Sequence, residues 1–309
     1  MSDRIFSNLM REIKSGKFVF TGELEPEKTT NLDELIEGAK VMKEAVVAAN
    51  VTDNPQSMAY MSSLVASYSV QKRSGLEMVY QLRCSDRNRI ALISDILGAG
   101  HLGIKNILAL TGDHTAVGDT PEAKPVFDLD SGQLCLLIRK MVDEGTDLNG
   151  KEIHDPPKIH VGVAGNPNCK PLEAEIFKIG RKVEGGAEFI QTQVIYDIEL
   201  AKTFIKEMER YKCPVLIGIF PMKSYGVAAY FDKYIPGVNV PKDLLTNLKD
   251  VKKSDLEKST KKKKYEDVNT KFFVPFIQEL MKTTKAVGVH VMAVNWEPYV
   301  VKLIKHVRG

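Results

Sequence analysis

Eight short apolar runs, separated by segments with helical periodicity, constrain the fold of this chain more than any other feature. The predicted strands cover residues 18–24, 46–52, 77–83, 106–111, 159–165, 188–195, 214–220 and 290–294. Between them, residues 32–42, 134–142 and 177–183 place apolar side chains on one stripe of a helix. Most of the strands begin roughly thirty residues apart, which is the length of a βαβ unit.

Regular alternation of strands and helices predicts an α/β protein with a parallel sheet, either closed or open. Eight units in 309 residues favour a single (β/α)8 TIM barrel, whose usual size is about 250 residues. A doubly wound open sheet is the alternative, but no G-x-G-x-x-G motif for dinucleotide binding follows the first predicted strand. We therefore expect one barrel domain over residues 1–309, with an insertion around residues 226–288 between the last two strands.

The predicted insertion carries a run of lysines at residues 261–264. Such a run predicts a solvated helix face or a mobile loop. A site for a phosphate or for a polyglutamate tail is the alternative.

Composition argues against several classes of partner. The small formal net charge of +3 gives no reason to expect a nucleic-acid or membrane partner. No apolar run approaches the ~20 residues that span a bilayer, and residues 1–5 lack the pattern of a signal peptide. We therefore expect a cytoplasmic protein.

The four cysteines form no C-x-x-C pair and the six histidines no H-E-x-x-H motif, so we expect no protein-bound metal.

Glu23 stands near the end of the first predicted strand, where a carboxylate needs an explanation. The strand should end close to Pro26, which cannot donate a ladder hydrogen bond. A carboxylate on an apolar strand is costly unless it is paired, solvated in a cleft or functional. In a TIM barrel this end of the strand faces the active site. Glu23 is therefore a candidate functional residue, and a rim glutamate paired with a lysine is the alternative.

Polar residues recur at the same end of nearly every other predicted strand. They are Thr52 and Asp53 after strand two, Gln81 and Arg83 in strand three, Thr111, Gly112 and Asp113 after strand four, Asn166 after strand five, Gln191, Thr192 and Gln193 in strand six, Tyr225 after strand seven and Asn295 after strand eight. Each is weak alone, because Thr-Gly-Asp and Asn-Pro are also common turns. Together, amides and hydroxyls with few charges suit a flat, hydrogen-bonding heterocycle.

With these residues in this order, the chain from Phe18 onwards resembles the methylenetetrahydrofolate reductase family. The resemblance lies in Gly-Glu-Leu-Glu-Pro at residues 22–26, Val-Thr-Asp at 51–53, Leu-Thr-Gly-Asp at 110–113, Val-Phe-Asp-Leu-Asp-Ser at 126–131, Arg-Lys-Val-Glu-Gly-Gly-Ala at 181–187 and Thr-Gln at 192–193. It implies a flavin-dependent (β/α)8 barrel that reduces 5,10-methylenetetrahydrofolate to 5-methyltetrahydrofolate by ping-pong hydride transfer. One-carbon metabolism and methionine biosynthesis are the implied context.

The resemblance also implies roles for the matched positions. Glu23 would be the general acid that protonates N10 of the folate, and Asp113 would stabilise the N5 iminium cation. Gln193, Tyr225 and Asn295 would bind the substrates. The flavin would be bound by Thr52, Gln81, Thr111, Gly112, Asp113, Asp130, Asn166, Glu175, Lys182 and Ala187, with Lys182 at a phosphate.

The implied cofactor is FAD, with FMN as the alternative because Thr111 stands where bacterial members often have an arginine. NADH or another reductant would donate electrons. The chain resembles short members that lack a C-terminal regulatory domain, so we expect a homo-oligomer or a complex with an iron–sulfur or zinc subunit. Two other functions stay open. One is a folate- or corrinoid-binding barrel that transfers methyl groups, and the other is the flavin subunit of a larger electron-transfer complex.

Overall fold

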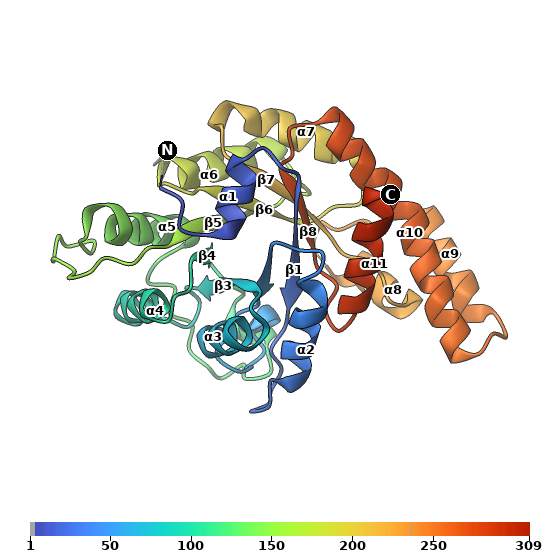
Figure 1. The fold of residues 1–309 in the computed structure, drawn as a ribbon, viewed down its shortest axis with the longest axis horizontal. Helices are drawn as coiled ribbons and strands as arrows, with labels where there is room; N and C mark the ends of the chain where they lie inside the picture. The colour runs from blue at the N-terminus through green and yellow to red at the C-terminus, as the bar shows by residue number, and fades with distance from the viewer. Residues whose placement is uncertain (1–3, 236) are drawn as a thin grey trace.

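The computed structural model describes residues 4–235 and 237–309, and eight parallel strands close into a barrel in chain order (Figure 1). The strands are β1 (Val19–Leu24), β2 (Ala48–Val51), β3 (Glu77–Arg83), β4 (Asn106–Leu110), β5 (His160–Gly165), β6 (Phe189–Val194), β7 (Val215–Ile219) and β8 (Gly288–Val291). β1 pairs with both β2 and β8, so the sheet has no edge. The predicted (β/α)8 barrel is confirmed, and the open-sheet alternative is wrong.

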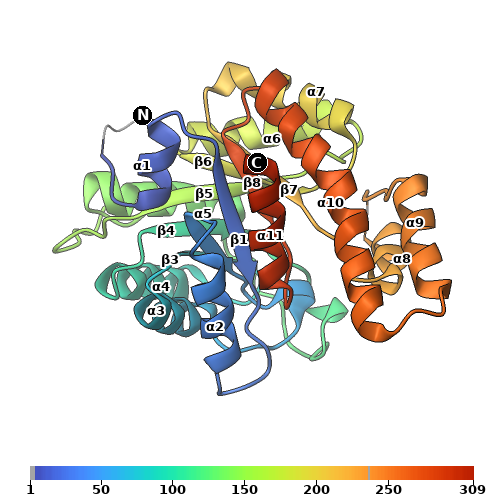
Figure 2. The ribbon, with the colours of Figure 1, turned by 45° about the vertical axis from the view of Figure 1, so that its right-hand side comes forward.

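Most of the helices lie around the outside of the barrel (Figures 1 and 2). They are α1 (Asn8–Lys14), α2 (Asp33–Met42), α3 (Ser63–Ser74), α4 (Arg89–His101), α5 (Ser131–Arg139), α6 (Leu172–Glu184), α7 (Ile198–Met208), α8 (Tyr225–Tyr234), α9 (Lys242–Lys253), α10 (Lys258–Thr283) and α11 (Glu297–Arg308). The helices predicted at residues 32–42 and 177–183 correspond to α2 and part of α6. The segment 134–142 covers the end of α5 and part of the π-helical turn that continues it, Lys140–Glu144.

The last strand is the one whose predicted bounds are displaced. We expected residues 290–294, but β8 begins at Gly288 and ends at Val291. A Cβ atom on Gly288 would lie 2.2 Å from the carbonyl oxygen of Val19, so only glycine allows β8 to approach β1 here. Glycine inside a strand normally weakens it, so the sequence offers no reason to begin the strand at Gly288. The close approach of β8 to β1, which requires glycine at this position, is seen only in the structure.

Apolar side chains fill the amino end of the barrel, and α1 covers them. The buried cluster comprises Val19, Ala48, Val79, Leu108, Phe189 and Leu216 from the strands, with Leu9, Met10 and Ile13 from α1. The ring of Phe189 occupies the space beside Gly162 of β5, where an added Cβ would lie 2.2 Å from it. This end of the barrel is therefore a packed core rather than a pore.

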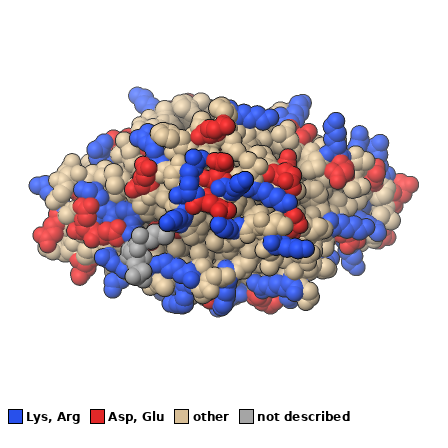
Figure 3. Space-filling model, turned by 90° about the horizontal axis from the view of Figure 1, so that it is seen from above, with Lys and Arg blue, Asp and Glu red and all other residues tan. Residues whose placement is uncertain are grey.

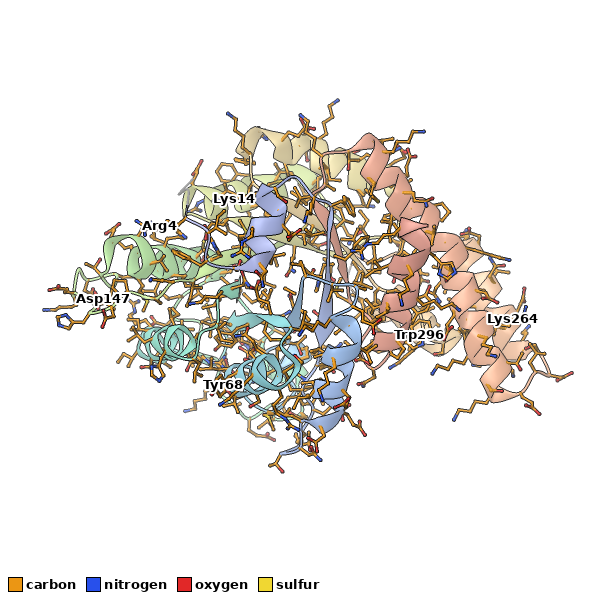
Figure 4. The ribbon with its side chains drawn as sticks, in the orientation of Figure 1. Arg4, Lys14, Tyr68, Asp147, Lys264 and Trp296 are labelled. Carbon is orange, nitrogen blue, oxygen red and sulfur yellow. The ribbon has the colours of Figure 1, made fainter. Side chains whose placement is uncertain are left out.

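The segment between β7 and β8 forms α8, α9 and α10. Helices α9 and α10 pack against each other; α9 and the start of α10 extend away from the barrel, whereas the rest of α10 packs beside α11 and α7 (Figures 1 and 2). Residues 262–264 of the lysine run are exposed on α10, whereas the neighbouring Tyr265 is buried. Lys264 lies at the edge of the molecule, far from the barrel axis (Figure 4). The lysine run is therefore part of a solvated helix face rather than a loop.

The surface carries charges of both signs. Lysine and arginine side chains lie among aspartates and glutamates on the face shown in Figure 3. Within residues 4–235 and 237–309, no helix is both long enough and apolar enough to span a bilayer. The prediction that there is no signal peptide concerns the start of the chain, of which residues 1–3 lie outside the described part.

Glu77, the first residue of β3, attaches α1 to the barrel. Its carboxylate accepts hydrogen bonds from the backbone N–H groups of Asn8 at 2.7 Å and Leu9 at 3.0 Å, and from Asn106 Nδ2 at 2.9 Å. The free N–H groups at a helix N-terminus carry partial positive charge, so a carboxylate is favourable there.

We predict that Glu77→Gln lowers the free energy of unfolding by about 1–3 kcal/mol, because hydrogen bonds to a charged acceptor are lost. Urea denaturation of the variant measures this change. The matched control is Glu12→Gln on α1, whose carboxylate pairs with the exposed Lys17 and should contribute at most ~1 kcal/mol. Equal effects of the two substitutions would contradict the role assigned to Glu77.

Candidate active site

A cavity of about 380 Å³ opens at the carboxyl ends of the strands. Strands β1 to β6 and β8 contribute to its wall, as do the loop after β4 and helix α6. The active sites of TIM-barrel enzymes lie at this end of the barrel. The cavity is therefore the candidate active site.

The barrel interior becomes polar between the apolar amino end and the cavity. Thr21, Asn50, Gln81, Gln191 and His290 are buried, and all five belong to strands. Along a strand, every second side chain points to the same side. Each of these five residues comes two positions after a residue nearer the amino end of its strand that faces the barrel interior. Its own side chain therefore points into the same interior. We call these five residues the polar layer.

Four members of the polar layer bond to one another, and the fifth, Gln81, donates to Glu23. Asn50 Nδ2 donates to Gln191 Oε1 at 2.7 Å, and Gln191 Nε2 donates back to Asn50 Oδ1 at 3.1 Å. Gln191 Nε2 also lies 3.4 Å from Thr21 Oγ1, which is 2.9 Å from His290 Nδ1. Buried amides and hydroxyls are stable when they are bonded in this way.

Glu23 lies where the polar layer meets the cavity. Its side chain is 12% exposed. Gln81 Nε2 donates to Oε2 of Glu23 at 3.3 Å, and His290 Nε2 lies 3.4 Å from the same oxygen. The partners of Glu23 are thus an amide and an imidazole, not the lysine expected for a rim glutamate. The carboxyl group lines the cavity and is available to a bound molecule.

Asp113 lies at the exposed rim of the cavity, in the loop after β4. Its carboxylate accepts a hydrogen bond from the Gln56 N–H at 2.9 Å, and its carbonyl accepts one from the Ser57 hydroxyl at 2.9 Å. Asn54, Gln56 and Ser57 all have positive φ, which costs of order 1–3 kcal/mol for each residue. The strained loop after β2 therefore fixes the orientation of the Asp113 carboxylate.

Helix α6 supplies a charged wall. The buried carboxylate of Glu175 accepts from the Asn166 N–H at 2.9 Å and pairs with Lys178 at 3.0 Å. Lys182 is also buried, and its Nζ donates to the Ala164 carbonyl at the end of β5 at 3.0 Å. Burial lowers the pKa of Lys182, and the charge of Lys178 lowers it further. An anionic group bound at this wall would stabilise the charged ammonium.

A second cavity of about 370 Å³ adjoins the first between α5 and α6. The two share Thr111, Ser131, Lys178 and Lys182 in their walls. Asp130, which caps the N-terminus of α5, lines the second cavity. Together the cavities form an elongated site with lysines near its middle, a shape that suits an extended phosphorylated molecule.

Most of the predicted site residues meet in these cavities. Glu23, Gln81, Thr111, Gly112, Asp113, Asn166, Glu175, Lys182 and Gln193 line the first, and Asp130 lines the second. Gly112 has a φ of 87°, and a Cβ there would lie 2.5 Å from the hydroxyl oxygen of Ser85, so this position requires glycine. In the described part of the chain, no three His, Cys, Asp or Glu side chains are grouped as a metal site would need.

Four predicted site residues lie elsewhere. Thr52 follows β2, and its buried hydroxyl has no hydrogen-bond partner among the described residues. Ala187 precedes β6 and so lies at the amino end of the barrel, opposite the cavity. Tyr225 begins α8, with the ammonium of Lys252 5.3 Å from its ring centroid. Asn295 lines a separate cavity of about 260 Å³. Ala187, Tyr225 and Asn295 do not line the first cavity, so their contact with a ligand stays a prediction.

Sequence reasoning missed Asn50 and His290, which both line the cavity. A polar residue inside a buried strand is itself a signal, because burial without a partner is costly. Asn50 lies two residues after Ala48, which faces the barrel interior, so the alternation of the strand predicts that Asn50 faces the interior too. For His290, the predicted strand began at the histidine itself, so no alternation was available to orient it.

Glu25 follows β1 and lines the same separate cavity as Asn295. Burial raises its pKa to about 7, and the negative charges of Glu23 and Glu27 contribute to the rise. The nearby Lys223 opposes it. Glu25 is therefore a carboxyl group with a raised pKa close to Glu23, although it lines the separate cavity and not the first one.

The fold and the cavities define a class: a TIM barrel with a polar cavity at the carboxyl ends of its strands and a second cavity that adjoins it between α5 and α6. The family model for methylenetetrahydrofolate reductase matches residues 8–308. The chain belongs to the methylenetetrahydrofolate reductase family, so the resemblance stated from its motifs is confirmed.

Individual relatives are distant. Methylenetetrahydrofolate reductase 2 of Saccharomyces cerevisiae is 26% identical over 252 residues, which cover 76% of this chain and 37% of the yeast protein. The 5,10-methylenetetrahydrofolate reductase of Pectobacterium carotovorum is 23% identical over 221 residues, or 68% of this chain and 66% of that protein. The chain spans less than half the length of the yeast and nematode relatives that it matches.

A solved structure shares the fold. It is described as an uncharacterized protein from Clostridium thermocellum that binds two copies of 5-methyl-5,6,7,8-tetrahydrofolic acid. The TM-score is 0.63 at 14% sequence identity, and the match covers 97% of this chain and 99% of that one.

The raised pKa of Glu25 predicts a pH dependence of stability. Its folded pKa of about 7 exceeds the ordinary value of 4.5, so the protonated form favours folding below pH 4.5, and this contribution is lost as the pH rises through 7. Glu25→Gln removes the titration. We expect the free energy of unfolding of the variant, relative to that of the wild type, to increase between pH 4.5 and pH 7.

Urea denaturation of both proteins across this pH range is the measurement. Glu27→Gln, which changes an exposed neighbouring carboxylate, is the control and should show a smaller pH-dependent difference. A difference between Glu25→Gln and wild type that stays constant with pH would show that Glu25 has an ordinary pKa.

Proposed function

We propose that the chain is a flavin-dependent reductase of 5,10-methylenetetrahydrofolate in which Glu23 protonates N10. The observation that carries the proposal is the position of Glu23 on the cavity wall, in contact with Gln81 and His290. Family membership and the names of the relatives support the reaction and its substrate. The ligand of the clostridial barrel is the product that this reaction would form.

The residues of the two cavities fit an FAD molecule. Lys182, buried and shared by both cavities, would bind a phosphate, and the hydroxyls of Thr111 and Ser131 stand beside it. The Ser85 hydroxyl, behind Gly112, is buried without a hydrogen-bond partner among the described residues. The length of the combined site favours FAD over FMN. When bound, a flavin supplies hydride transfer from a donor to the folate in two successive half-reactions.

The chain's own residues would prepare the folate for reduction. Ring opening of the substrate to the N5 iminium requires a proton at N10, and Glu23 would donate it. The Asp113 carboxylate at the rim would stabilise the resulting cation. Gln193, exposed on the wall, offers both a donor and an acceptor to the pterin. These roles do not depend on whether the electron donor is NADH or a reductant brought by a partner subunit.

Lys182→Met should weaken flavin binding at least tenfold, because a buried ammonium is removed from the proposed phosphate site. Titration of flavin into the flavin-free protein, followed by fluorescence, measures the dissociation constant. Lys206→Met on α7, where the lysine is exposed, is the matched control. If Lys182→Met bound flavin as tightly as the wild type, Lys182 would not be a ligand of the flavin phosphate.

Glu23→Gln keeps the size of the side chain and removes the acidic proton. We expect flavin reduction by the donor to be nearly unchanged and folate reduction to fall by about 10²–10⁴-fold, the usual contribution of a general acid. Anaerobic stopped-flow of the two half-reactions separates these effects. If both half-reactions slowed equally, Glu23 would be structural, and Glu25 would be the next candidate acid.

A further inference from the structure

His290, a member of the polar layer, lies between Thr21 and Glu23. It is 3% exposed and belongs to β8, directly opposite Thr21 of β1 in the ladder. Its Nδ1 lies 2.9 Å from Thr21 Oγ1, and its Nε2 lies 3.4 Å from Glu23 Oε2. One imidazole therefore connects the buried network to the carboxyl group that lines the cavity.

The neighbours of His290 determine which ring nitrogen carries the proton. The amide nitrogen of Gln191 is a donor, so the Thr21 hydroxyl already accepts one hydrogen bond from it. Thr21 is fully buried, and its own proton needs an acceptor. The Nδ1 atom of His290 is the acceptor that the structure offers. Neutral His290 then carries its proton on Nε2, the nitrogen that faces Glu23.

We propose that His290 is a positioning residue for folate reduction, which donates from Nε2 to Oε2 of Glu23 and leaves Oε1 for the substrate. The inference rests on the proposed function, in which the O–H bond of the Glu23 carboxyl group breaks and an N10–H bond forms. The carboxylate that remains keeps two neutral donors on Oε2, from His290 and Gln81.

The contact contributes most after the proton has left Glu23. Hydrogen bonds to an ionised acceptor are stronger than those to a neutral one. The two contacts to Oε2 are long, at 3.4 Å and 3.3 Å, so both can shorten as negative charge develops there. An interaction that strengthens during proton transfer lowers the barrier rather than the KM.

Two substitutions separate this role from packing. His290→Asn places an amide oxygen near the position of Nδ1, so it keeps the contact with Thr21 but cannot reach Glu23. His290→Gln extends an amide N–H to about the level of Nε2, so it restores a donor to Glu23. His306→Asn, on the exposed face of α11, is the matched control for a histidine outside the cavity.

We expect His290→Asn to slow the folate half-reaction by about tenfold or more, a part of the 10²–10⁴-fold contribution of a general acid. The concentration of folate at half-maximal rate should stay unchanged, and so should flavin reduction by the donor. His290→Gln should recover most of the rate. Equal loss in both variants, or equal slowing of both half-reactions, would overturn the proposal.

Nitrogen NMR of the protein labelled with ¹⁵N-histidine gives a readout that does not depend on turnover. The His290 signals, assigned by their loss in His290→Gln, should show a proton on Nε2 and none on Nδ1. A proton on Nδ1 would refute the inference whatever the enzyme does. If the wild type failed to reduce the folate while the tautomer was as expected, the proposed function would fail instead.

Discussion

Closure of the sheet is the constraint on which the site depends, because it forces every second side chain of each strand into one shared interior. At the amino end that interior is filled by apolar residues beneath α1. Further along, the same strands carry the polar layer, and Glu23 is where β1 reaches the cavity. The change from packed core to candidate active site occurs within the six residues of β1.

The polar layer is stable inside the barrel because its members bond to each other or, in the case of Gln81, to Glu23. A buried amide without a partner costs about 1–3 kcal/mol by protein mutational data, and the pair of hydrogen bonds between Asn50 and Gln191 avoids that cost for two of them. A buried network with its bonds satisfied has one arrangement, so it presents Glu23 to the cavity in one orientation. Apart from Glu23 and His290, the ionisable side chains of the cavity wall lie at its margins, on Asp113 and along α6.

The barrel could be predicted from the sequence because its signals are local: apolar runs, helical stripes and their spacing. Glu23 followed from the same reasoning, as a charge at the end of an apolar strand. His290 did not, because its orientation depends on where β8 begins, and that is set by the contact of Gly288 with Val19. Tyr225 and Asn295 were assigned from the resemblance, and neither lines the first cavity in the structure, so their contact with a substrate stays a prediction.

The central claim is that this barrel passes reducing equivalents to a folate bound beside Glu23. The most direct test is a single turnover of the flavin-loaded protein, reduced anaerobically with dithionite and then mixed with 5,10-methylenetetrahydrofolate. We expect the absorbance of oxidised flavin to return while an equal amount of 5-methyltetrahydrofolate forms. A protein that remains reduced, or that is reoxidised without forming the methyl product, would contradict the claim.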